Sequence, residues 1–392
     1  MRHLFVTVDY PPDLGGMARR HVELCRRLAN EGVIVSTVAA ANAQRFDQEE
    51  PYRITREPFT FQGAKTATNR WRWARSIARR AAESDVIHCG NIRPCGYPLL
   101  MARRGAGSRA PYLVYVNGSD LLQEREKITA SAMKRWFVRR LLGQCAGIVA
   151  NSAWTAETAW ALCETLGIDA TERIVAIDLG TDPDQFRPDN DRGALRASLG
   201  WQGLCVALTV ARLVPHKGQD VALRAMAAVV REHPTLRYLV VGDGPNEDAL
   251  RRLASDLGVA DRVAFAGPMS DQDVAEAYAT SDIYIGLSRQ DGKAIEGFGI
   301  SFVEASASGL PIIAGDSGGV RSAVRDGETG VVVKPNDPDA VASALRQLLA
   351  SPDRRKALGH AGRRAVETHY NWDRVARETT EFAERAVRRN VN

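Results

Sequence analysis

Apolar and polar positions follow a regular order along this chain. Short apolar runs alternate with longer stretches in which apolar residues recur at helical spacing, a pattern typical of βαβ units and parallel sheets. The strands predicted in the first half are His3–Val8, Val33–Ala39, Val86–His88, Tyr112–Val116, Gly147–Ala150 and Ile174–Ala176. Those predicted in the second half are Cys205–Val210, Arg237–Val241, Val263–Ala266, Ile283–Ile285, Pro311–Ile313 and Gly330–Val332. The fold class is therefore α/β, with one open, doubly wound sheet in each half.

The chain is expected to form two domains, because its 392 residues exceed what one hydrophobic core usually covers. The segment Thr181–Arg192 is polar, contains two prolines and separates the two sets of strands. We place the boundary within it, with residues 1–183 in the first domain and 184–370 in the second. The stretch from Asn371 to Arg389 has the pattern of one long helix.

Composition and charge narrow the class of protein. Hydrophobic content of 45% and charged content of 25% are ordinary for a globular protein and exclude general disorder. The net charge of +5 is too small for the dense basic stripe of a nucleic-acid-binding protein. The six cysteines form no CxxC pair, which indicates reduced core thiols. No stretch reaches the roughly 18 apolar residues of a membrane span, so we expect a cytoplasmic protein.

The most informative segment is EGFGISFVEASASGLPII, from Glu296 to Ile313. It places Glu296 and Glu304 on either side of the loop Gly297–Gly299, and a helix is predicted from Ser301 to Ser308. A helix that begins behind a glycine loop points unpaired N–H groups at its ligand, which suits a phosphate. Carboxylates beside those donors suit hydroxyl groups. The combination is typical of a sugar-nucleotide site.

Two carboxylates also serve as the acid and base of glycosidases. The segment ARLVPHKGQD argues against that alternative, because Arg212 and Lys217 follow a predicted strand and form a natural pair for a diphosphate. A glycosidase needs no such pair. We therefore expect Glu304 to bind ribose hydroxyls and Glu296 to bind a hydroxyl of the transferred sugar. The alternative for Arg212 and Lys217 is that both are solvated surface cations.

Loops at other strand ends supply further candidates. Gly15 and Gly16 follow the first strand and permit close approach to a ligand, although an ordinary tight turn has the same residues. Gly242 ends a strand in the second half. Asn117 and Asp120 are candidates for contacts to the sugar or the acceptor, with an Asn-Gly turn and a helix cap as the alternative. His88 is a candidate acceptor contact or a core histidine.

Three segments have the form of a metal site or of a membrane-binding helix, and each also has a purely structural interpretation. Asp271-Gln272-Asp273 has the form of a metal-binding DxD, but Ser270 and Asp271 precede a predicted helix and are expected to cap it. No metal is predicted. Lys65–Arg80 and Met133–Leu142 are rich in cations and tryptophan, as expected for a helix on an anionic membrane surface. The alternative is an amphipathic helix whose tryptophans face the core.

The segments GGMARRHVELCRRL, ARLVPHKGQD, VGDGP, EGFGISFVEASASGLPII, GDSGG and DGETG together resemble the retaining glycosyltransferases of family four. The resemblance covers nearly the whole chain and is most similar to the bacterial phosphatidylinositol-mannoside mannosyltransferases. It implies the GT-B architecture: two Rossmann-like domains whose parallel sheets face a central cleft. It also implies that the C-terminal helix, residues 371–392, crosses back to the first domain.

The resemblance also implies residue roles. The donor diphosphate is bound by Arg212 and Lys217, the ribose by Glu304 and the sugar by Glu296. Backbone groups of Gly16 and of Phe298, Gly299 and Ile300 complete the donor site. Many members carry a histidine where this chain has Asn117, so a protonatable group is missing there. We place Arg212, Lys217, Glu296 and Asn117 in the catalytic set.

The function expected from the sequence is transfer of a sugar from a nucleotide-sugar donor to an acceptor hydroxyl, with retention and without a metal or other cofactor. The resemblance favours GDP-mannose over a UDP-sugar. The acceptor is expected to be a glycolipid, a lipid-linked or cell-surface glycan precursor or a small metabolite. Attachment to the inner face of the membrane, through Lys65–Arg80, is also expected. The alternative function is a non-catalytic subunit of a membrane assembly that binds a sugar nucleotide or glycan.

Overall fold

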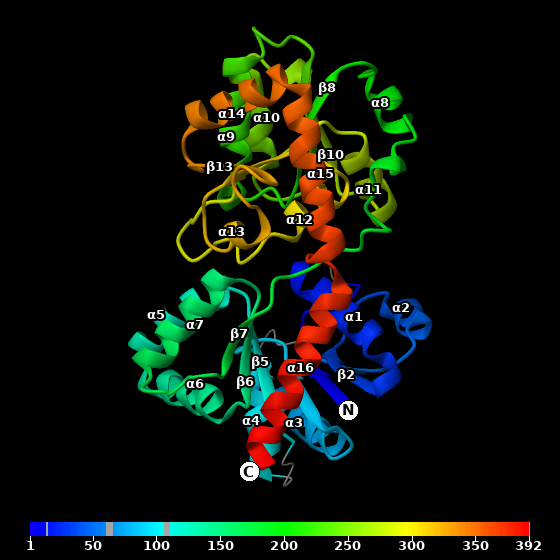
Figure 1. Ribbon diagram of the computed structural model, residues 1–392. Helices are drawn as coiled ribbons and strands as arrows, with labels where there is room; N and C mark the ends of the chain where they lie inside the picture. Colours follow the sequence, from blue (N-terminus) through cyan, green and yellow to red (C-terminus); the bar gives the residue numbers. More distant parts are fainter. Residues whose placement is uncertain (13–14, 60–65, 106–109, 392) are drawn as a thin grey trace. The chain divides into compact units, whose positions relative to one another are not determined.

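The structure, a computed structural model, describes residues 1–12, 15–59, 66–105 and 110–391 (Figure 1). The predicted site and membrane segments include positions 13, 14 and 65, which lie outside these residues. The chain forms two compact units. Unit 1 comprises Met1–Leu179 and Trp372–Asn392, and unit 2 comprises Gly180–Asn371. Each unit is built around its own parallel sheet.

Unit 1 contains a seven-stranded sheet in the order β3-β2-β1-β4-β5-β6-β7, and every pairing is parallel. The strands are β1 (His3–Val6), β2 (Val33–Val38), β3 (Arg53–Glu57), β4 (Val86–Cys89), β5 (Tyr112–Val116), β6 (Gly147–Ala150) and β7 (Ile174–Ala176). The helices are α1 (Gly16–Arg27), η1 (Ala29–Glu31), α2 (Ala43–Glu49), α3 (Thr66–Ala81), α4 (Gly96–Gly105), α5 (Ser119–Ala130), α6 (Ala132–Gln144), α7 (Ala153–Thr165) and α16 (Trp372–Val391).

The sheet of unit 1 is buried on both faces, as its continuous apolar strands require. Side chains alternate along β5, so that Tyr112, Val114 and Val116 join the core that α3, α4, α6 and α7 cover. Tyr115 points to the opposite face, where the guanidinium of Arg20 on α1 lies 4.4 Å from its ring centroid. Both faces of β5 thus carry structural contacts before the strand reaches its polar carboxyl end.

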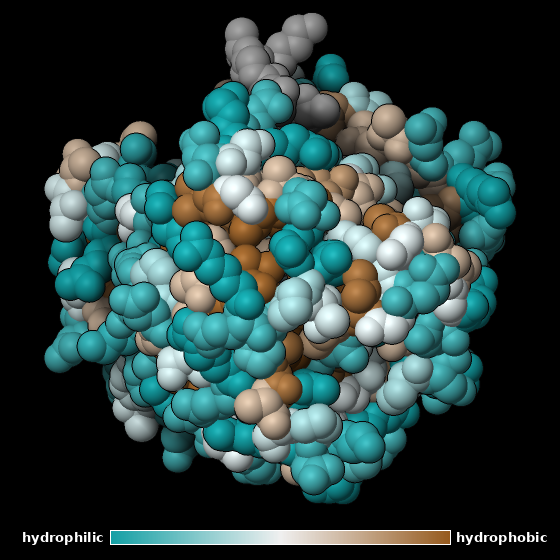
Figure 2. All heavy atoms as spheres, turned by 90° about the horizontal axis from the view of Figure 1, so that it is seen from above, coloured by the Kyte–Doolittle hydropathy of each residue, from teal (hydrophilic) through white to brown (hydrophobic). Residues whose placement is uncertain are grey.

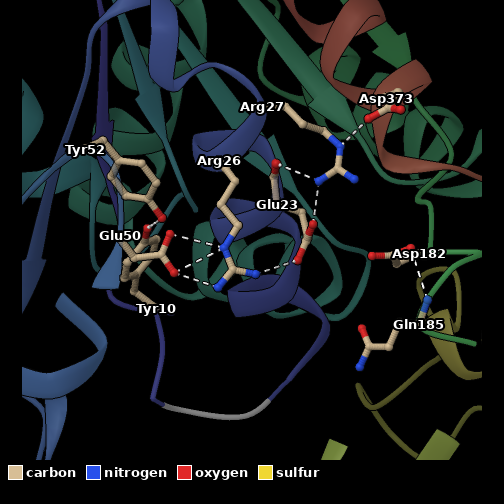
Figure 3. A network of polar contacts seen from close by, with 9 residues as sticks. All are labelled: Tyr10, Glu23, Arg26, Arg27, Glu50, Tyr52, Asp182, Gln185 and Asp373. Atoms are coloured by element: carbon tan, nitrogen blue, oxygen red, sulfur yellow. Dashed lines mark hydrogen bonds and ion pairs between the residues drawn. The ribbon is translucent and has the colours of Figure 1, made fainter. Parts of the chain in front are cut away.

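The C-terminal helix α16 packs on unit 1, as the resemblance implied. A Cβ at Gly147 would lie 2.5 Å from the ring of Phe382, so the bare glycine is what lets this helix approach the sheet. Figure 3 shows the polar contacts that hold α1 beside it. Arg27 Nε donates to Asp373 Oδ1 over 2.6 Å, while Glu23 accepts from both Arg26 and Arg27. These contacts fix the helix whose N-terminus carries Gly16.

Unit 2 contains a six-stranded parallel sheet in the order β10-β9-β8-β11-β12-β13. The strands are β8 (Cys205–Val210), β9 (Leu236–Val241), β10 (Val263–Gly267), β11 (Ile283–Gly286), β12 (Ile312–Gly315) and β13 (Gly330–Val333). The helices are η2 (Pro188–Asn190), α8 (Ala194–Leu199), η3 (Pro215–Lys217), α9 (Gln219–Val229), α10 (Glu247–Asp256), η4 (Ala260–Arg262), α11 (Asp271–Ala279), α12 (Ile300–Ala307), α13 (Val320–Ala323), α14 (Pro338–Ala350) and α15 (Pro352–Thr368).

The predicted α/β class and the twelve predicted strands are confirmed, with ends that differ by at most two residues. One strand was missed. β3 has the sequence RITRE and lies at the edge of its sheet, where it pairs with β2 only. A charged edge strand lacks the apolar run that identifies a buried strand.

The cysteines and the surface agree with a globular protein. Of the six free cysteines, five are buried and Cys205 is half-buried. Figure 2 shows one face of the molecule, on which hydrophilic side chains predominate and apolar ones form small patches. Among the described helices, none has the length and apolar character needed to cross a membrane.

Candidate functional site

The sheet of unit 2 has a switch point between β8 and β11, because the strand order runs outward in opposite directions from this pair. Ligands of open α/β sheets bind beyond the carboxyl ends of the strands at such a point. β8 ends at Val210 and leads into η3, while β11 ends at Gly286 and leads into the loop before α12. Both segments that the sequence singled out therefore begin at this edge.

The loop after β8 is fixed to the loop after β9. Ala211 N donates to the Val241 carbonyl over 3.0 Å, and Leu213 N donates to the Asp243 carbonyl over 2.7 Å. Gly242 has a φ of 119°, and a Cβ there would lie 2.2 Å from the carbonyl oxygen of Ala211. Gly242 thus allows the two loops to meet. This loop contact by itself accounts for a glycine at position 242. The predicted contact of Gly242 with the donor stays a prediction.

Lys217, the last residue of η3, extends its ammonium group toward Glu296. Lys217 Nζ lies 2.5 Å from Glu296 Oε2, although the two residues are 79 positions apart. The backbone supports this contact, since Arg289 N donates to the His216 carbonyl over 2.8 Å. A Cβ at Gly218 would lie 2.2 Å from the Leu287 carbonyl oxygen, so the chain passes β11 closely only with glycine there. The two predicted segments form one cluster.

Glu296 is largely shielded, with 14% of its side chain exposed. Ser288 Oγ donates to the same Oε2 over 2.9 Å. Burial alone acts to raise the pKa of Glu296, but the charge of Lys217 and the hydrogen bonds from Lys217 and Ser288 outweigh it, and the pKa is lowered. Glu296 is therefore an ionised acceptor. Both hydrogen bonds from described residues end on Glu296 Oε2, so Glu296 Oε1 can accept from another group.

A glycine turn leads from Glu296 into α12. Gly299 precedes the helix with a φ of 91°, in the left-handed region that favours glycine. Ile300 is the first helical residue, and Phe298 is buried against the Tyr370 ring at a centroid distance of 6.2 Å. No acidic residue lies in the first turn of α12. Its first N–H groups have no intrahelical acceptor, so this end of the helix suits an anion.

The GDSGG segment contacts the backbone of Glu296. Gly319 N donates to the Glu296 carbonyl over 2.9 Å. A Cβ at Gly318 would lie 2.3 Å from that carbonyl oxygen, and Gly318 has a φ of 58°. The backbone around Glu296 is thus fixed on both sides, which sets the position of its carboxylate.

Glu304, one turn into α12, accepts a hydrogen bond from Tyr278 over 2.9 Å between Tyr Oη and Oε2. Burial, followed by the nearby Glu304 carboxylate, raises the pKa of Tyr278 well above its ordinary value. Tyr278 therefore stays protonated and donates to Glu304. Tyr278 was not predicted, because it belongs to no motif, and Ser288 was given no role of its own.

Arg212 and His216 complete the cluster. The Arg212 side chain is exposed, and its carbonyl accepts from Gln219 Nε2 over 3.0 Å. Burial and the neighbouring Lys217 lower the pKa of His216, against the effect of Glu296, so the imidazole is neutral. Arg212 and Lys217 both act to lower this pKa while Glu296 and Asp291 act to raise it, so charges of both signs lie around His216. The two cations suit a phosphate.

In unit 1, Gly15 and Gly16 form the start of α1. Both are exposed, and Gly15 has a φ of 150° with open space where a Cβ would lie. No side chain caps this end among the described residues, and the first turn contains no acidic residue. The N–H groups there are therefore placed as an anion site requires.

Arg20, one turn further along α1, was not predicted. It is buried, and its Nε and Nη2 have no hydrogen-bond partner in the described chain. Nη1 lies 3.5 Å from Asn117 Oδ1. Burial lowers its pKa to about 10, although Tyr115 and Asp120 act in the opposite direction. Burying a guanidinium with unpaired donors costs folding free energy. Arginines on helices usually lie on the surface, and Arg20 departs from that rule.

Asn117 and Asp120 lie together at the carboxyl end of β5. Asp120 Oδ1 accepts from the backbone N–H of Asn117 over 3.0 Å and of Leu121 over 2.9 Å, whereas the N-cap of α5 is Gly118. Asp120 Oδ2 is buried without a partner among the described residues. Burial raises the pKa of Asp120 to about 6, while those N–H groups act to lower it. One carboxylate oxygen of Asp120 is thus held by local N–H groups and the other is unsatisfied, and the N-cap aspartate of the alternative is not observed.

His88 is a core residue in this structure. It is 1% exposed, and its ring stacks on Phe5 at a centroid distance of 4.2 Å. His88 Nε2 lies 2.9 Å from His3 Nδ1, and Nδ1 lies 2.8 Å from Tyr115 Oη. Both nitrogens are therefore occupied by protein groups. His88 therefore has neither exposed surface nor a free ring nitrogen with which to contact an acceptor. The structure favours the core-histidine alternative over the acceptor contact.

The predicted membrane segment is only partly exposed. Trp73 on α3 is buried, and its indole N–H donates to Ser36 Oγ over 2.8 Å, which contradicts a position at a lipid headgroup. Trp71 is 51% exposed, with Arg75 over its ring. Ser270 caps α11 as predicted, accepting from Asp273 N over 3.2 Å. No cluster of metal ligands occurs among the residues that the structure describes.

Two family descriptions match consecutive parts of the chain. Residues 14–185 match "Glycosyltransferase Family 4" and residues 191–365 match "Glycosyl transferases group 1". The first corresponds to most of unit 1 and the second to most of unit 2.

Relatives match over nearly the full length. A GDP-mannose-dependent alpha-(1-6)-phosphatidylinositol monomannoside mannosyltransferase of Mycobacterium tuberculosis is 32% identical and covers 97% of each chain. A GDP-mannose-dependent monoacylated alpha-(1-6)-phosphatidylinositol monomannoside mannosyltransferase of Corynebacterium glutamicum is 30% identical and covers 96% of each. Among solved structures, Anabaena Alr3699/HepE in complex with UDP has a TM-score of 0.79 at 20% identity, covering 97% of this chain and 99% of that one. This last likeness shows the fold.

Proposed function

Because this chain belongs to the glycosyltransferases of family four and acts on a nucleotide sugar, we propose that it transfers mannose from GDP-mannose to an acceptor hydroxyl with retention of configuration. The observation that carries the proposal is the cluster of Lys217, Ser288 and Glu296 at the switch point of unit 2. The choice of GDP-mannose is supported by the donor named for the full-length relatives.

In the proposed donor complex, Arg212 and Lys217 bind the diphosphate together with the N–H groups at the start of α12. Lys217 then exchanges part of its contact with Glu296 for a phosphate oxygen. Glu296 Oε1 accepts a hydroxyl of the sugar, and Glu304 accepts a ribose hydroxyl. In unit 1, Gly16 supplies backbone donors, and Asn117 and Asp120 supply polar groups for the acceptor.

The proposed reaction breaks the bond between the anomeric carbon and the β-phosphate oxygen and forms a bond from that carbon to the acceptor oxygen on the same face. The acceptor proton passes to the departing phosphate. Arg212 and Lys217 stabilise the negative charge that grows on the diphosphate, the role of fixed donors at a developing oxyanion. Asn117 is compatible with this path, because no protein group has to take up the proton.

The electrostatics of Glu296 argue against a role as the acid of a glycosidase. A glycosidase acid needs a raised pKa so that it holds a proton at neutral pH. The pKa of Glu296 is lowered, mainly through Lys217 once burial is overcome. An ionised Glu296 is suited to accept hydroxyl hydrogen bonds and not to protonate a leaving group.

Metal independence and the acceptor are parts of the same proposal. We expect EDTA to leave the transfer rate unchanged, because Arg212 and Lys217 supply the positive charge at the diphosphate. The acceptor is proposed to be a hydroxyl of a glycolipid, as the names of the mycobacterial and corynebacterial relatives suggest. A glycolipid acceptor also requires the enzyme to work at a membrane surface.

Thermal-shift measurements with GDP-mannose, UDP-glucose and other nucleotide sugars test the donor, since a ligand of the native state raises the melting temperature. GDP-mannose should give the largest shift. NMR of the product with a phosphatidylinositol mannoside acceptor should show the α-anomer. A larger shift with a UDP-sugar would contradict the donor assignment, and a β-mannoside would contradict retention.

A further inference from the structure

A cavity of about 590 Å³ in unit 1 is lined by four arginines: Arg103, Arg140, Arg173 and Arg389. It lies at the amino end of the sheet, since Arg103 stacks over Tyr112, the first residue of β5, and Arg173 directly precedes β7. The predicted acceptor residues follow the carboxyl end of β5. The cavity is therefore separate from the groups assigned to transfer.

Two of the arginines are fixed by the protein itself. Arg173 Nη2 donates to the carbonyls of Leu142 and Cys145 over 2.5 and 2.9 Å, and Arg103 donates to the Ala110 carbonyl. These bonds satisfy carbonyl groups near the end of α6 and before β5. They also hold two positive charges at the wall of the cavity.

The other two arginines are less constrained. Arg140 lies 5.8 Å from the Trp136 ring centroid, and the described residues give it no ion pair. Arg389 is 39% exposed, donates to the Glu172 carbonyl over 2.8 Å and lies 3.8 Å from Glu172 Oε2. No carboxylate is among the described residues that line the cavity. Such a concentration of arginine is suited to a phosphate, which arginine binds with two parallel hydrogen bonds.

Exposed apolar side chains lie on two of the helices that line the cavity, α4 and α6. Met133, Trp136 and Arg140 share one face of α6, at the spacing i, i+3, i+7, and Met133 and Trp136 are 74% and 52% exposed. Met101 on α4, two residues before Arg103, is 38% exposed. Among the described residues, every large hydrophobic side chain exposed to this extent belongs to unit 1. Unit 2 offers no comparable surface.

We propose that this cavity binds the headgroup phosphate of an anionic lipid while Met133 and Trp136 enter the bilayer interface. A free phosphate needs the arginines but not an exposed indole and thioether beside them. An indole beside cations is the usual composition of a surface that lies on anionic lipid. The second groove of unit 1, beside Trp160, contains Glu157, Glu164 and Asp169 and would repel such a lipid.

The test uses the full chain and vesicles of phosphatidylcholine with or without phosphatidylglycerol. The double variant Arg140→Gln/Arg389→Gln removes the two less constrained charges and keeps the two that bond to carbonyls. Its partition onto phosphatidylglycerol vesicles should be weaker by roughly thirtyfold, about 2 kcal/mol for two cations. The variant Trp136→Ala should weaken binding to the same vesicles without a change in charge.

The matched control is Arg231→Gln/Arg252→Gln, which removes two exposed arginines of unit 2 and changes the net charge equally. It should bind vesicles like the wild type. Binding of GDP should be the same in all three variants, so a failure here is distinguishable from a failure of the donor assignment. Isothermal titration with inorganic phosphate and glycerol 3-phosphate forms the soluble arm.

Equal loss of vesicle binding in both double variants would overturn the proposal, because net charge alone would then account for the binding. The proposal also fails if Trp136→Ala binds vesicles like the wild type. Phosphate binding that depends on Arg140 and Arg389, without any affinity for phosphatidylglycerol vesicles, would assign the cavity to a soluble anion instead.

Discussion

At the scale of single residues, the proposed chemistry depends on charges held where burial opposes them. Lys217 and Glu296 form an ion pair at the end of β8, with 19% and 14% of their side chains exposed. Arg20 is buried with two nitrogens unpartnered in the described chain. Buried groups of this kind reduce stability unless a partner or ligand compensates, so they are expected at functional sites.

Asp120 should make stability depend on pH. Its pKa in the folded state is about 6, raised by burial, whereas an unfolded aspartate titrates near 4. The folded protein therefore binds this proton more tightly, and its contribution to stability falls as pH rises from about 4 to about 6. Asp120→Asn should remove this fall and stabilise unit 1 by about 1–2 kcal/mol at pH 7.

Urea unfolding of the wild type and Asp120→Asn at pH 4, 5, 6 and 7 measures this effect. The exposed Asp261→Asn serves as the control and should follow the wild-type profile. Parallel profiles for wild type and Asp120→Asn would show that Asp120 has an ordinary pKa.

The sequence revealed some of these residues and concealed others for physical reasons. Arg212 and Lys217 were predicted because they follow a strand, and Glu296 and Glu304 were predicted because they flank a glycine loop. Arg20 was not, because a cation on a helix usually lies in solvent, and only the packing against Tyr115 shows that it is buried. Tyr278 and the role of Ser288 were missed because a hydroxyl bonded to a carboxylate leaves no pattern in the chain.

At the scale of elements, glycines determine how closely the loops of unit 2 approach. Gly218, Gly242 and Gly318 each leave no room for a Cβ, since a backbone carbonyl oxygen lies within 2.3 Å of its place. These contacts bring η3, the loop before α12 and the GDSGG segment together around Glu296. The sequence indicated the glycines, but it did not indicate which carbonyl each one faces.

Gly218 and Gly292 provide a matched pair for this effect. Both are in the left-handed region, with φ of 72° and 58°, but a Cβ at Gly292 meets open space. Gly292→Ala should therefore cost only the conformational strain, about 1 kcal/mol. Gly218→Ala adds a clash with the Leu287 carbonyl and should cost at least about 3 kcal/mol.

Chemical denaturation of unit 2 measures both changes, and donor binding should weaken only in Gly218→Ala. If the two variants had the same free energy of unfolding, Gly218 would not lie against the Leu287 carbonyl, and the described contact between these loops would be contradicted.

At the scale of the whole molecule, the chain leaves unit 1 at Leu179 and returns to it at Trp372. The strand pattern indicated two sheets, but the assignment of the last helix came from family resemblance, because periodicity alone does not show which domain a helix covers. The structure supplies the contacts that attach it, among them Phe382 on Gly147 and Arg27 with Asp373.

Unit 1 should therefore depend on α16 for its stability. Phe382 is 3% exposed, and Phe382→Ala should destabilise unit 1 by about 3–5 kcal/mol. The exposed Glu381→Ala should change stability by less than about 0.5 kcal/mol. Calorimetry with and without GDP distinguishes the units, because GDP should raise only the transition of unit 2. If Phe382→Ala lowered the GDP-sensitive transition instead, α16 would stabilise unit 2, and its assignment to unit 1 would be wrong.

Isothermal titration of GDP into wild type, Lys217→Ala and the exposed control Lys356→Ala tests most directly whether Lys217 binds the diphosphate. The wild type and Lys356→Ala should bind GDP equally. Lys217→Ala should bind roughly 10- to 100-fold more weakly, since a charge-assisted hydrogen bond contributes about 1.5–3 kcal/mol. Equal affinity in all three proteins would contradict the account.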